Sequence, residues 1–150
     1  MTITKKIQIK NIKTGKNVEI INPVNLYECE IGDKSFIGPF VEIQKNVIIG
    51  SNTRIQSHSF ICSNVKIGNG CFIGHGVMFI NDKFENGRPS GKSVFRDTQV
   101  GNKVSLGSNS TILPVNICDN VVIGAGSVVT KDINKPGIYL GNPAKFLRNF

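Results

Sequence analysis

The two histidines, His58 and His75, are the side chains in this sequence best suited to exchange a proton near neutral pH. His75 lies in the stretch FIGHGVMFIND, residues 72–82, two positions after Ile73. Comparable positions in the chain carry Asp, Pro, Ser or Asn, so the local backbone gives little reason for an imidazole there. We therefore interpret His75 as a general base, or as a group that orients the nucleophile.

The same stretch ends in three residues that could hold a substrate. Asn81 and Asp82 could form hydrogen bonds with a polar ligand, and Phe79 could provide an apolar wall. An irregular polar segment, residues 81–97, follows them. A segment of this length inside a compact domain usually binds or covers a ligand. We expect these three residues to bind substrate, with a plain loop start as the alternative.

A repeat of six residues must position these groups. Aliphatic residues recur at this step from Ile31 to Phe79 and, after the polar segment, from Val100 to Val129, with one slip at ILPVN. Glycine often follows the aliphatic residue, and Asn or Gly often lies three positions after it, where a positive φ is tolerated. Each hexad should form one strand and one corner, and three hexads should complete one coil. The repeat therefore predicts an all-β parallel β-helix of about five coils.

The remaining segments complete a single domain, residues 1–150. Residues 1–24 should cap the first coil as a hairpin or added strands, and residues 81–97 should form an excursion loop. Residues 134–150 should form a short tail with a strand, a Gly-Asn-Pro turn and one helical turn.

Residues eighteen positions apart should stack in neighbouring coils. His58 then lies beneath Gly76, beside His75, and Ser108 lies above His75 if the excursion replaces only a corner. We expect this column to hold the catalytic residues His75 and His58 beside exposed backbone amides at Gly107. His58 also occupies a place where a positive φ is needed, so backbone geometry alone is an equally good explanation for it.

Composition narrows the possible ligands. The net charge of +8 favours anionic partners, but the basic residues have few aromatic neighbours, so we expect small phosphorylated ligands and no nucleic acid. No apolar run approaches a membrane span and the N-terminus does not resemble a signal peptide, so we expect a cytoplasmic protein without membrane contact. Two histidines and irregularly spaced cysteines suggest neither a metal site nor disulfides.

The repeat, together with GAGSVVTKDI at 124–133 and GNPAK at 141–145, resembles the hexapeptide-repeat acyltransferases. This resemblance implies a left-handed β-helix, a homotrimer with sites between subunits, and acetyl-CoA as acyl donor. It also implies contacts with CoA. Backbone amides of Gly107 and Ala125, with Ser108 beside them, would face the pantetheine, and Lys131, Lys145 and Arg148 would face phosphate, although simple solubility explains the lysines as well.

A closer resemblance rests on GHGVMFIND and ILPVNICDN, and it is to the 3-N-acetyltransferases of dTDP-3-amino-3,6-dideoxyhexoses. It implies transfer of an acetyl group by direct attack of a sugar amine, for bacterial surface polysaccharide such as lipopolysaccharide O-antigen. Two alternatives stay open. The chain could acetylate another sugar, such as a UDP-4-amino sugar or a sugar hydroxyl, or it could be a noncatalytic β-helix scaffold.

Overall fold

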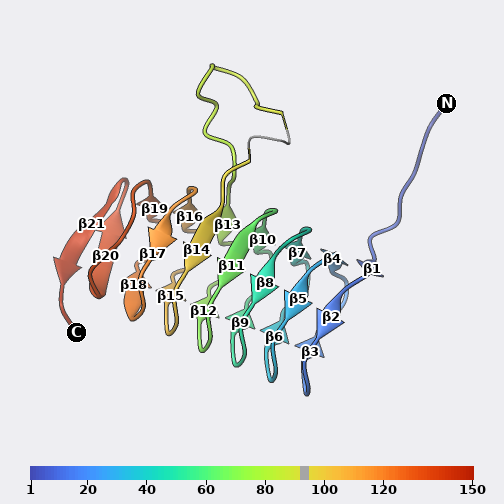
Figure 1. Cartoon of the computed structure of the whole chain (residues 1–150), viewed down its shortest axis with the longest axis horizontal. Helices are drawn as coiled ribbons and strands as arrows, with labels where there is room; N and C mark the ends of the chain where they lie inside the picture. The colour runs from blue at the N-terminus through green and yellow to red at the C-terminus, as the bar shows by residue number, and fades with distance from the viewer. Residues whose placement is uncertain (92–94) are drawn as a thin grey trace.

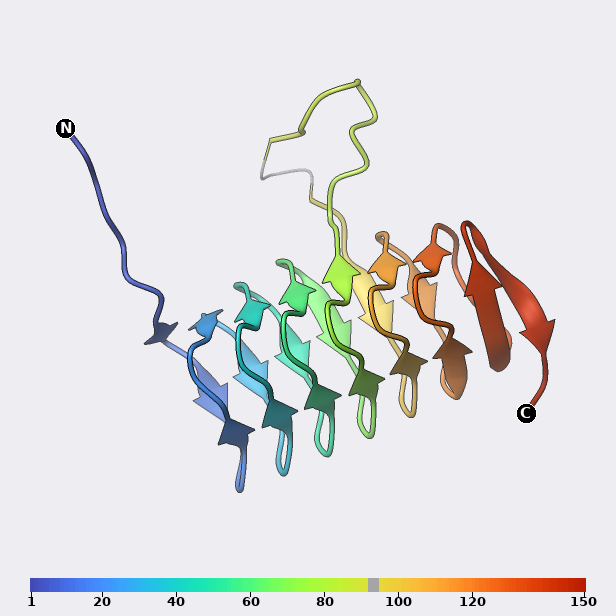
Figure 2. The ribbon, with the colours of Figure 1, turned by 180° about the vertical axis from the view of Figure 1, so that it is seen from behind.

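The structure, a computed structural model, describes residues 1–91 and 95–150. The chain winds into a triangular prism whose three walls are β-sheets, and from β1 to β19 every third strand along the sequence joins the same wall (Figure 1). The polypeptide turns a corner after nearly every strand, so each coil contains one strand from each wall (Figure 2). The all-β parallel β-helix predicted from the repeat is confirmed.

The first sheet has seven strands in the order β1–β4–β7–β10–β13–β16–β19. Their bounds are Ile9–Lys10 (β1), Asn25–Tyr27 (β4), Glu42–Ile43 (β7), Phe60–Ile61 (β10), Met78–Phe79 (β13), Thr111–Ile112 (β16) and Val128–Val129 (β19). The second sheet has six strands, Lys13–Thr14 (β2), Glu30–Ile31 (β5), Ile48–Ile49 (β8), Val65–Ile67 (β11), Thr98–Val100 (β14) and Asn116–Ile117 (β17).

The third sheet has eight strands and ends in the C-terminal hairpin. Its strands are Glu19–Ile20 (β3), Phe36–Ile37 (β6), Arg54–Ile55 (β9), Phe72–Ile73 (β12), Ser105–Leu106 (β15), Val121–Ile123 (β18), Gly137–Gly141 (β20) and Ala144–Arg148 (β21). All pairs within the three sheets are parallel except β20 with β21.

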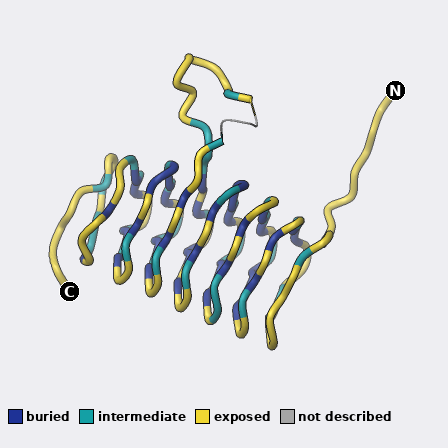
Figure 3. The backbone as a smooth tube through the Cα atoms, viewed as in Figure 1, coloured by how far each residue is buried: buried dark blue, intermediate teal, exposed yellow. Residues whose placement is uncertain are grey.

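The aliphatic residue of each hexad points into the prism. Ile55, Ile73 and Leu106 pair in register in the third sheet, and all three are fully buried. Figure 3 shows the same alternation along the whole solenoid, with buried residues lining its interior and exposed residues at the corners. The register across β12 and β15 also confirms that the excursion replaces a corner without disturbing the stack.

The corner conformation agrees with the repeat as well. Positive φ occurs at every predicted Asn or Gly, namely Asn46, Asn52, Asn64, Gly70, Gly76, Asn109, Asn120 and Gly126. The same place also holds Lys34, Phe40 and Lys103, residue types that adopt this conformation reluctantly.

The two ends agree with the expectation in part. Residues 9–20 form added strands, β1, β2 and β3, rather than a hairpin. They pair in parallel with the next coil, so the first wall has seven strands and the solenoid has more than the five coils predicted. Backbone hydrogen bonds hold this coil, such as Lys13 N–H to the Cys29 carbonyl, and Ile12, Val18 and Ile20 pack, partly buried, against the core. The predicted helical turn near the C-terminus is wrong. Tyr139 and Phe146 pack edge to face across a hairpin, which extends the sheet instead.

The excursion leaves the prism after β13 and returns at β14, and it projects well away from the coils (Figure 1). Its base is closed by a hydrogen bond from Arg96 N–H to the Asn81 carbonyl, 3.1 Å. Within the described ranges, no helix is long and apolar enough to cross a bilayer.

Candidate active site

His75 lies on the edge of the prism where the chain passes from the third sheet to the first, which we call the histidine edge. Ser57, His75, Ser108 and Ala125 occupy the same corner place in successive coils after β9, β12, β15 and β18. Hydrogen bonds fix the stack, from Gly76 N–H to the Ser57 carbonyl and from Asn109 N–H to the His75 carbonyl. The predicted column is therefore present, with Ser108 beside His75.

The imidazole of His75 is exposed, and it is held at one of its two nitrogens. Nδ1 lies 2.9 Å from Oγ of Ser57 in the preceding coil. Asn69, in the corresponding place on the neighbouring edge, likewise reaches back one coil, where its Oδ1 accepts a hydrogen bond from Ser51 N–H at 2.7 Å. The corner geometry thus directs this side chain toward the preceding coil and leaves Nε2 free for a ligand.

His58 lies one coil away, in the corner place next to Ser57. Its φ is +63°, and its ring stacks on Phe40 with the ring centroids 4.8 Å apart. Its N–H donates to the Pro39 carbonyl. The structure thus supports the backbone explanation for His58, and its catalytic role stays a prediction.

Backbone amides distinguish the histidine edge from the edge between the second and third sheets. On that second edge, Asp or Asn side chains cap the corner N–H groups, as Asn102 does for Asn69 and Asp119 does for Asn102. On the histidine edge no side chain of residues 1–91 or 95–150 caps these N–H groups. In the described part of the chain the N–H groups of the four stacked residues donate no hydrogen bond; these residues are Ser57, His75, Ser108 and Ala125. Four uncapped donors in a row form a surface suited to ligand carbonyl oxygens.

The prediction of an exposed amide at Gly107 is wrong. Gly107 N–H donates to the Ile123 carbonyl at 2.8 Å, as part of the sheet. Glycine is required there for packing, because a Cβ would lie 2.4 Å from the nitrogen of Ala125. The neighbouring amides of Ser108 and Ala125 are the uncapped ones.

The three residues predicted to contact phosphate lie near the C-terminal end of the solenoid, but they do not form one cluster. Lys145 and Arg148 are exposed on β21, at the end of the third sheet. Lys131 follows β19, where the chain leaves the first sheet, and therefore lies on a different edge from Ala125. Exposed cations at this end of the solenoid are compatible with a phosphorylated ligand, and their roles stay predictions.

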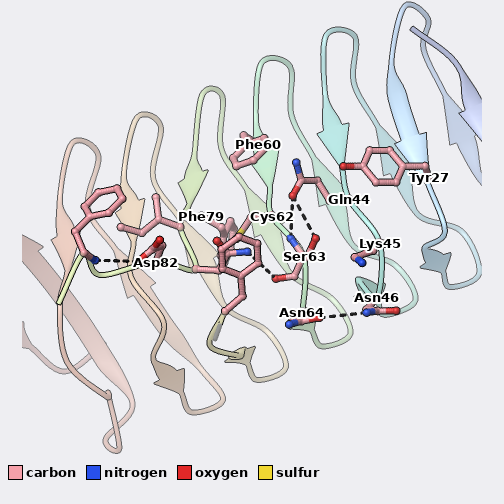
Figure 4. Close-up of a pocket in the computed structure, with 14 residues that line it drawn as sticks. Tyr27, Gln44, Lys45, Asn46, Phe60, Cys62, Ser63, Asn64, Phe79 and Asp82 are labelled. Carbon is pink, nitrogen blue, oxygen red and sulfur yellow. Dashed lines mark hydrogen bonds between the residues drawn. The ribbon is translucent and has the colours of Figure 1, made fainter. Parts of the chain in front are cut away.

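Asn81 and Asp82 lie on the edge between the first and second sheets, which we call the loop edge. They line a pocket of about 650 Å³ beneath the excursion (Figure 4). Both side chains also organise the loop. Asp82 accepts hydrogen bonds from the N–H groups of Phe84 and Ser90, and Asn81 Nδ2 donates to the Ser63 carbonyl at 3.4 Å. The backbone bond from Phe84 lowers the pKa of the Asp82 carboxyl.

The walls of this pocket are more aromatic than the sequence suggested. Phe79, predicted as an apolar wall, is fully buried because it occupies the inward place of its hexad. The remaining lining residues are Tyr27, Gln44, Lys45, Asn46, Phe60, Cys62, Ser63, Asn64, Ile80, Phe84 and Phe95. Phe60 could have been found from the repeat, because it stands in an outward place beside Ile61. Phe84 and Phe95 lie in the loop and follow no pattern.

One chain does not bring the predicted base and the predicted substrate residues together. His75 and Asn81 lie at opposite ends of β13, on two different edges of the prism. Outward-facing Met78, on β13, and Phe72, on β12, border the histidine edge and are about 41% and 42% exposed. Each of these apolar side chains is thus partly accessible from outside the chain.

The cysteines are poor nucleophiles. Burial raises the pKa of Cys62, which lines the pocket, to about 12 and that of Cys29 to about 11. Both thiols are protonated at neutral pH, so neither is suited to carry an acyl group.

Two family models match the chain. Residues 28–63 match the bacterial transferase hexapeptide (six repeats), and residues 98–131 match the hexapeptide repeat of succinyl-transferase. The bifunctional protein GlmU of Streptococcus uberis is 31% identical over 93% of this chain and 32% of its own length. A probable macrolide acetyltransferase of Lysinibacillus sphaericus is 47% identical over 35% of this chain and 29% of its own length. The chain thus spans only about a third of these curated relatives.

Solved structures agree in fold. A variant of AntD, an N-acyltransferase from Bacillus cereus in complex with dTDP and coenzyme A, superposes with a TM-score of 0.83 at 22% identity, over 91% of this chain and 83% of that one. A hexapeptide-repeat acetyltransferase from Vibrio cholerae complexed with acetyl coenzyme A gives 0.68 at 25% identity, over 79% and 69%. The chain is therefore a hexapeptide-repeat protein that resembles, in sequence and in fold, the acyltransferases built on this solenoid.

Proposed function

We propose that the chain transfers an acetyl group from acetyl-CoA to the amino group of a nucleotide-linked amino-deoxyhexose, with a dTDP-3-amino-3,6-dideoxyhexose as the favoured acceptor. The observation that carries this proposal is the histidine edge, where an exposed imidazole lies in a row of uncapped backbone amides. The dTDP and coenzyme A bound to AntD support the choice of donor and acceptor.

The chemistry required of these residues is modest. A neutral amine is already a good nucleophile, so the site must hold it against the thioester, take one proton and stabilise the oxyanion. The N–H groups of Ser108 and Ala125 would donate to carbonyl oxygens of the donor. As the new carbon–nitrogen bond forms, His75 would accept the amine proton, and it would return that proton to the sulfur when the carbon–sulfur bond breaks.

The acceptor would use the pocket on the loop edge. Phe60, Phe84 and Phe95 offer aromatic surface to a base, and Lys45 offers a cation to a diphosphate. Because His75 and Asn81 lie on different edges, we propose that the complete site forms between copies of the chain, in a homotrimer. The exposed Phe72 and Met78 beside His75 support packing against a second copy.

The place of this reaction in the cell is also part of the proposal. An acetylated nucleotide sugar suits the assembly of bacterial surface polysaccharide, such as lipopolysaccharide O-antigen, from precursors made in the cytoplasm.

The test is an assay of thiol release from acetyl-CoA with dTDP- and UDP-linked amino sugars, together with their deaminated, hydroxyl-bearing analogues. We expect turnover with dTDP-3-amino sugars and its loss, by about a hundredfold or more, in His75→Gln. Turnover of only the hydroxyl analogues, or of only the UDP-4-amino sugars, would indicate that the acceptor is that alternative substrate. Absence of both turnover and calorimetric acetyl-CoA binding would favour a noncatalytic scaffold.

A further inference from the structure

Ser57 is the residue that touches the His75 ring on the side facing the preceding coil. Its Oγ lies 2.9 Å from Nδ1, and no other hydrogen-bond partner of Oγ is present in the described part of the chain. Ser57 is half-buried, whereas His75 is exposed. The contact therefore joins an anchored hydroxyl to a ring whose other nitrogen is open.

The contact exists because of the corner geometry. On the edge between the second and third sheets, the equivalent contact to the preceding coil is a hydrogen bond from the backbone N–H of Ser51 to Oδ1 of Asn69. Nδ1 of His75 lies as many bonds from the backbone as Oδ1 of Asn69, but it contacts the Ser57 hydroxyl in place of a backbone amide. Gly38, in the coil below, leaves room for Ser57, since a Cβ at position 38 would lie 2.8 Å from the Ser57 nitrogen.

The tautomer of His75 decides what this contact does. A neutral imidazole has one N–H and one lone pair. If Nε2 carries the proton, the lone pair is at Nδ1, where Ser57 occupies it and an incoming amine cannot reach it. If Nδ1 carries the proton and donates it to Ser57 Oγ, the lone pair is at Nε2, on the open side of the ring.

We propose that Ser57 is a positioning residue that accepts a hydrogen bond from Nδ1–H of His75 and thereby presents Nε2 as the proton acceptor. This inference rests on the proposed acyl transfer. The same hydrogen bond persists after Nε2 takes the amine proton, because imidazolium donates from both nitrogens. Proton transfer then requires no movement of Ser57, which lowers the reorganisation that accompanies the reaction.

The tautomer can be measured on the free protein by ¹⁵N NMR of the histidine rings at a pH where they are neutral, with His75→Gln to assign the signals. We expect the Nδ1–H form to dominate at His75 in the wild type and in Ser57→Thr, which keeps the hydroxyl. Ser57→Ala should move the ring toward the Nε2–H form. A dominant Nε2–H form in the wild type, or an unchanged tautomer in Ser57→Ala, would overturn the inference.

Kinetics supply a second readout. Ser57→Ala should lower kcat by about tenfold and leave the KM for acetyl-CoA unchanged, and Ser57→Thr should restore most of the rate. Equal rates for the alanine variant and the wild type would contradict the positioning role. If the wild type acetylates no amino sugar, the proposed function fails. The NMR result still decides independently whether Ser57 sets the tautomer.

Discussion

The carboxylate of Asp82 accepts a hydrogen bond from the backbone N–H of Ser90, eight residues further along the excursion. It also accepts one from Phe84 N–H, so one side chain closes the start of the loop above the pocket. Asp82 therefore has a structural task that is separate from any contact with substrate.

Loop order should follow the charge of Asp82. The backbone hydrogen bonds from Phe84 and Ser90 lower the pKa of Asp82. The contribution of the Asp82 carboxylate to loop order is therefore complete above the ordinary pKa of a carboxyl group, and it is lost as the pH falls through the lowered pKa. Limited proteolysis should cut the excursion several-fold faster in Asp82→Ala than in the wild type at neutral pH. Asp97→Ala, which removes a charge at the loop's far end, is the control. Equal cleavage of the two variants would show that the Asp82 bonds do not order the loop.

Gly107→Ala should destabilise the solenoid. The new Cβ would lie 2.4 Å from the Ala125 nitrogen in the next coil, so the coils must separate locally, at a cost of about 1–3 kcal/mol in the free energy of unfolding. Denaturant unfolding measures this loss.

Gly124→Ala is the matched control for Gly107→Ala. The nearest atoms to its Cβ would all belong to side chains, Leu140 at 3.3 Å and Ser127 Oγ at 3.6 Å, so the cost should stay below about 1 kcal/mol. A Gly107→Ala protein as stable as this control would mean that the coils are not packed as closely as described.

The sequence predicted the walls of the prism better than its ends or its loop. The hexad pattern fixes which residues point inward, so the register of Ile55, Ile73 and Leu106, and hence the position of His75 beside Ser108, followed directly. The first coil was missed because the step of six is broken after it: Ile20 and Leu26 keep the step, but the next inward residue, Ile31, follows one position early.

Contacts that depend on side-chain direction could not be predicted. The bond from His75 to Ser57 requires knowing that a corner side chain reaches back one coil, which is visible only in three dimensions. The separation of His75 from Asn81, in contrast, follows from the repeat, because residues six positions apart lie on two neighbouring edges of the prism with one strand between them.

Lys103→Asn should stabilise the protein. Lys103 has a φ of +54°, a conformation that costs about 1 kcal/mol for residues with an ordinary side chain and less for asparagine. The melting temperature should therefore rise in Lys103→Asn and stay near the wild-type value in Lys103→Ala, which removes the same charge but keeps the strain. A similar rise in both variants would assign the gain to charge rather than to the backbone.

Two buried hydroxyl groups should respond oppositely to removal. Thr98 Oγ1 is buried and has no hydrogen-bond partner within residues 1–91 and 95–150, whereas Ser59 Oγ donates to the Gly74 carbonyl at 2.8 Å. Thr98→Val removes an unsatisfied group and keeps the shape, so it should leave the free energy of unfolding unchanged or raise it by up to about 1 kcal/mol. Ser59→Ala leaves the Gly74 carbonyl without its partner and should lower the free energy of unfolding by about 1–2 kcal/mol. Chemical denaturation of both variants checks the pair. A loss of stability in Thr98→Val equal to that in Ser59→Ala would mean that the Thr98 hydroxyl is satisfied inside the prism by a bound water.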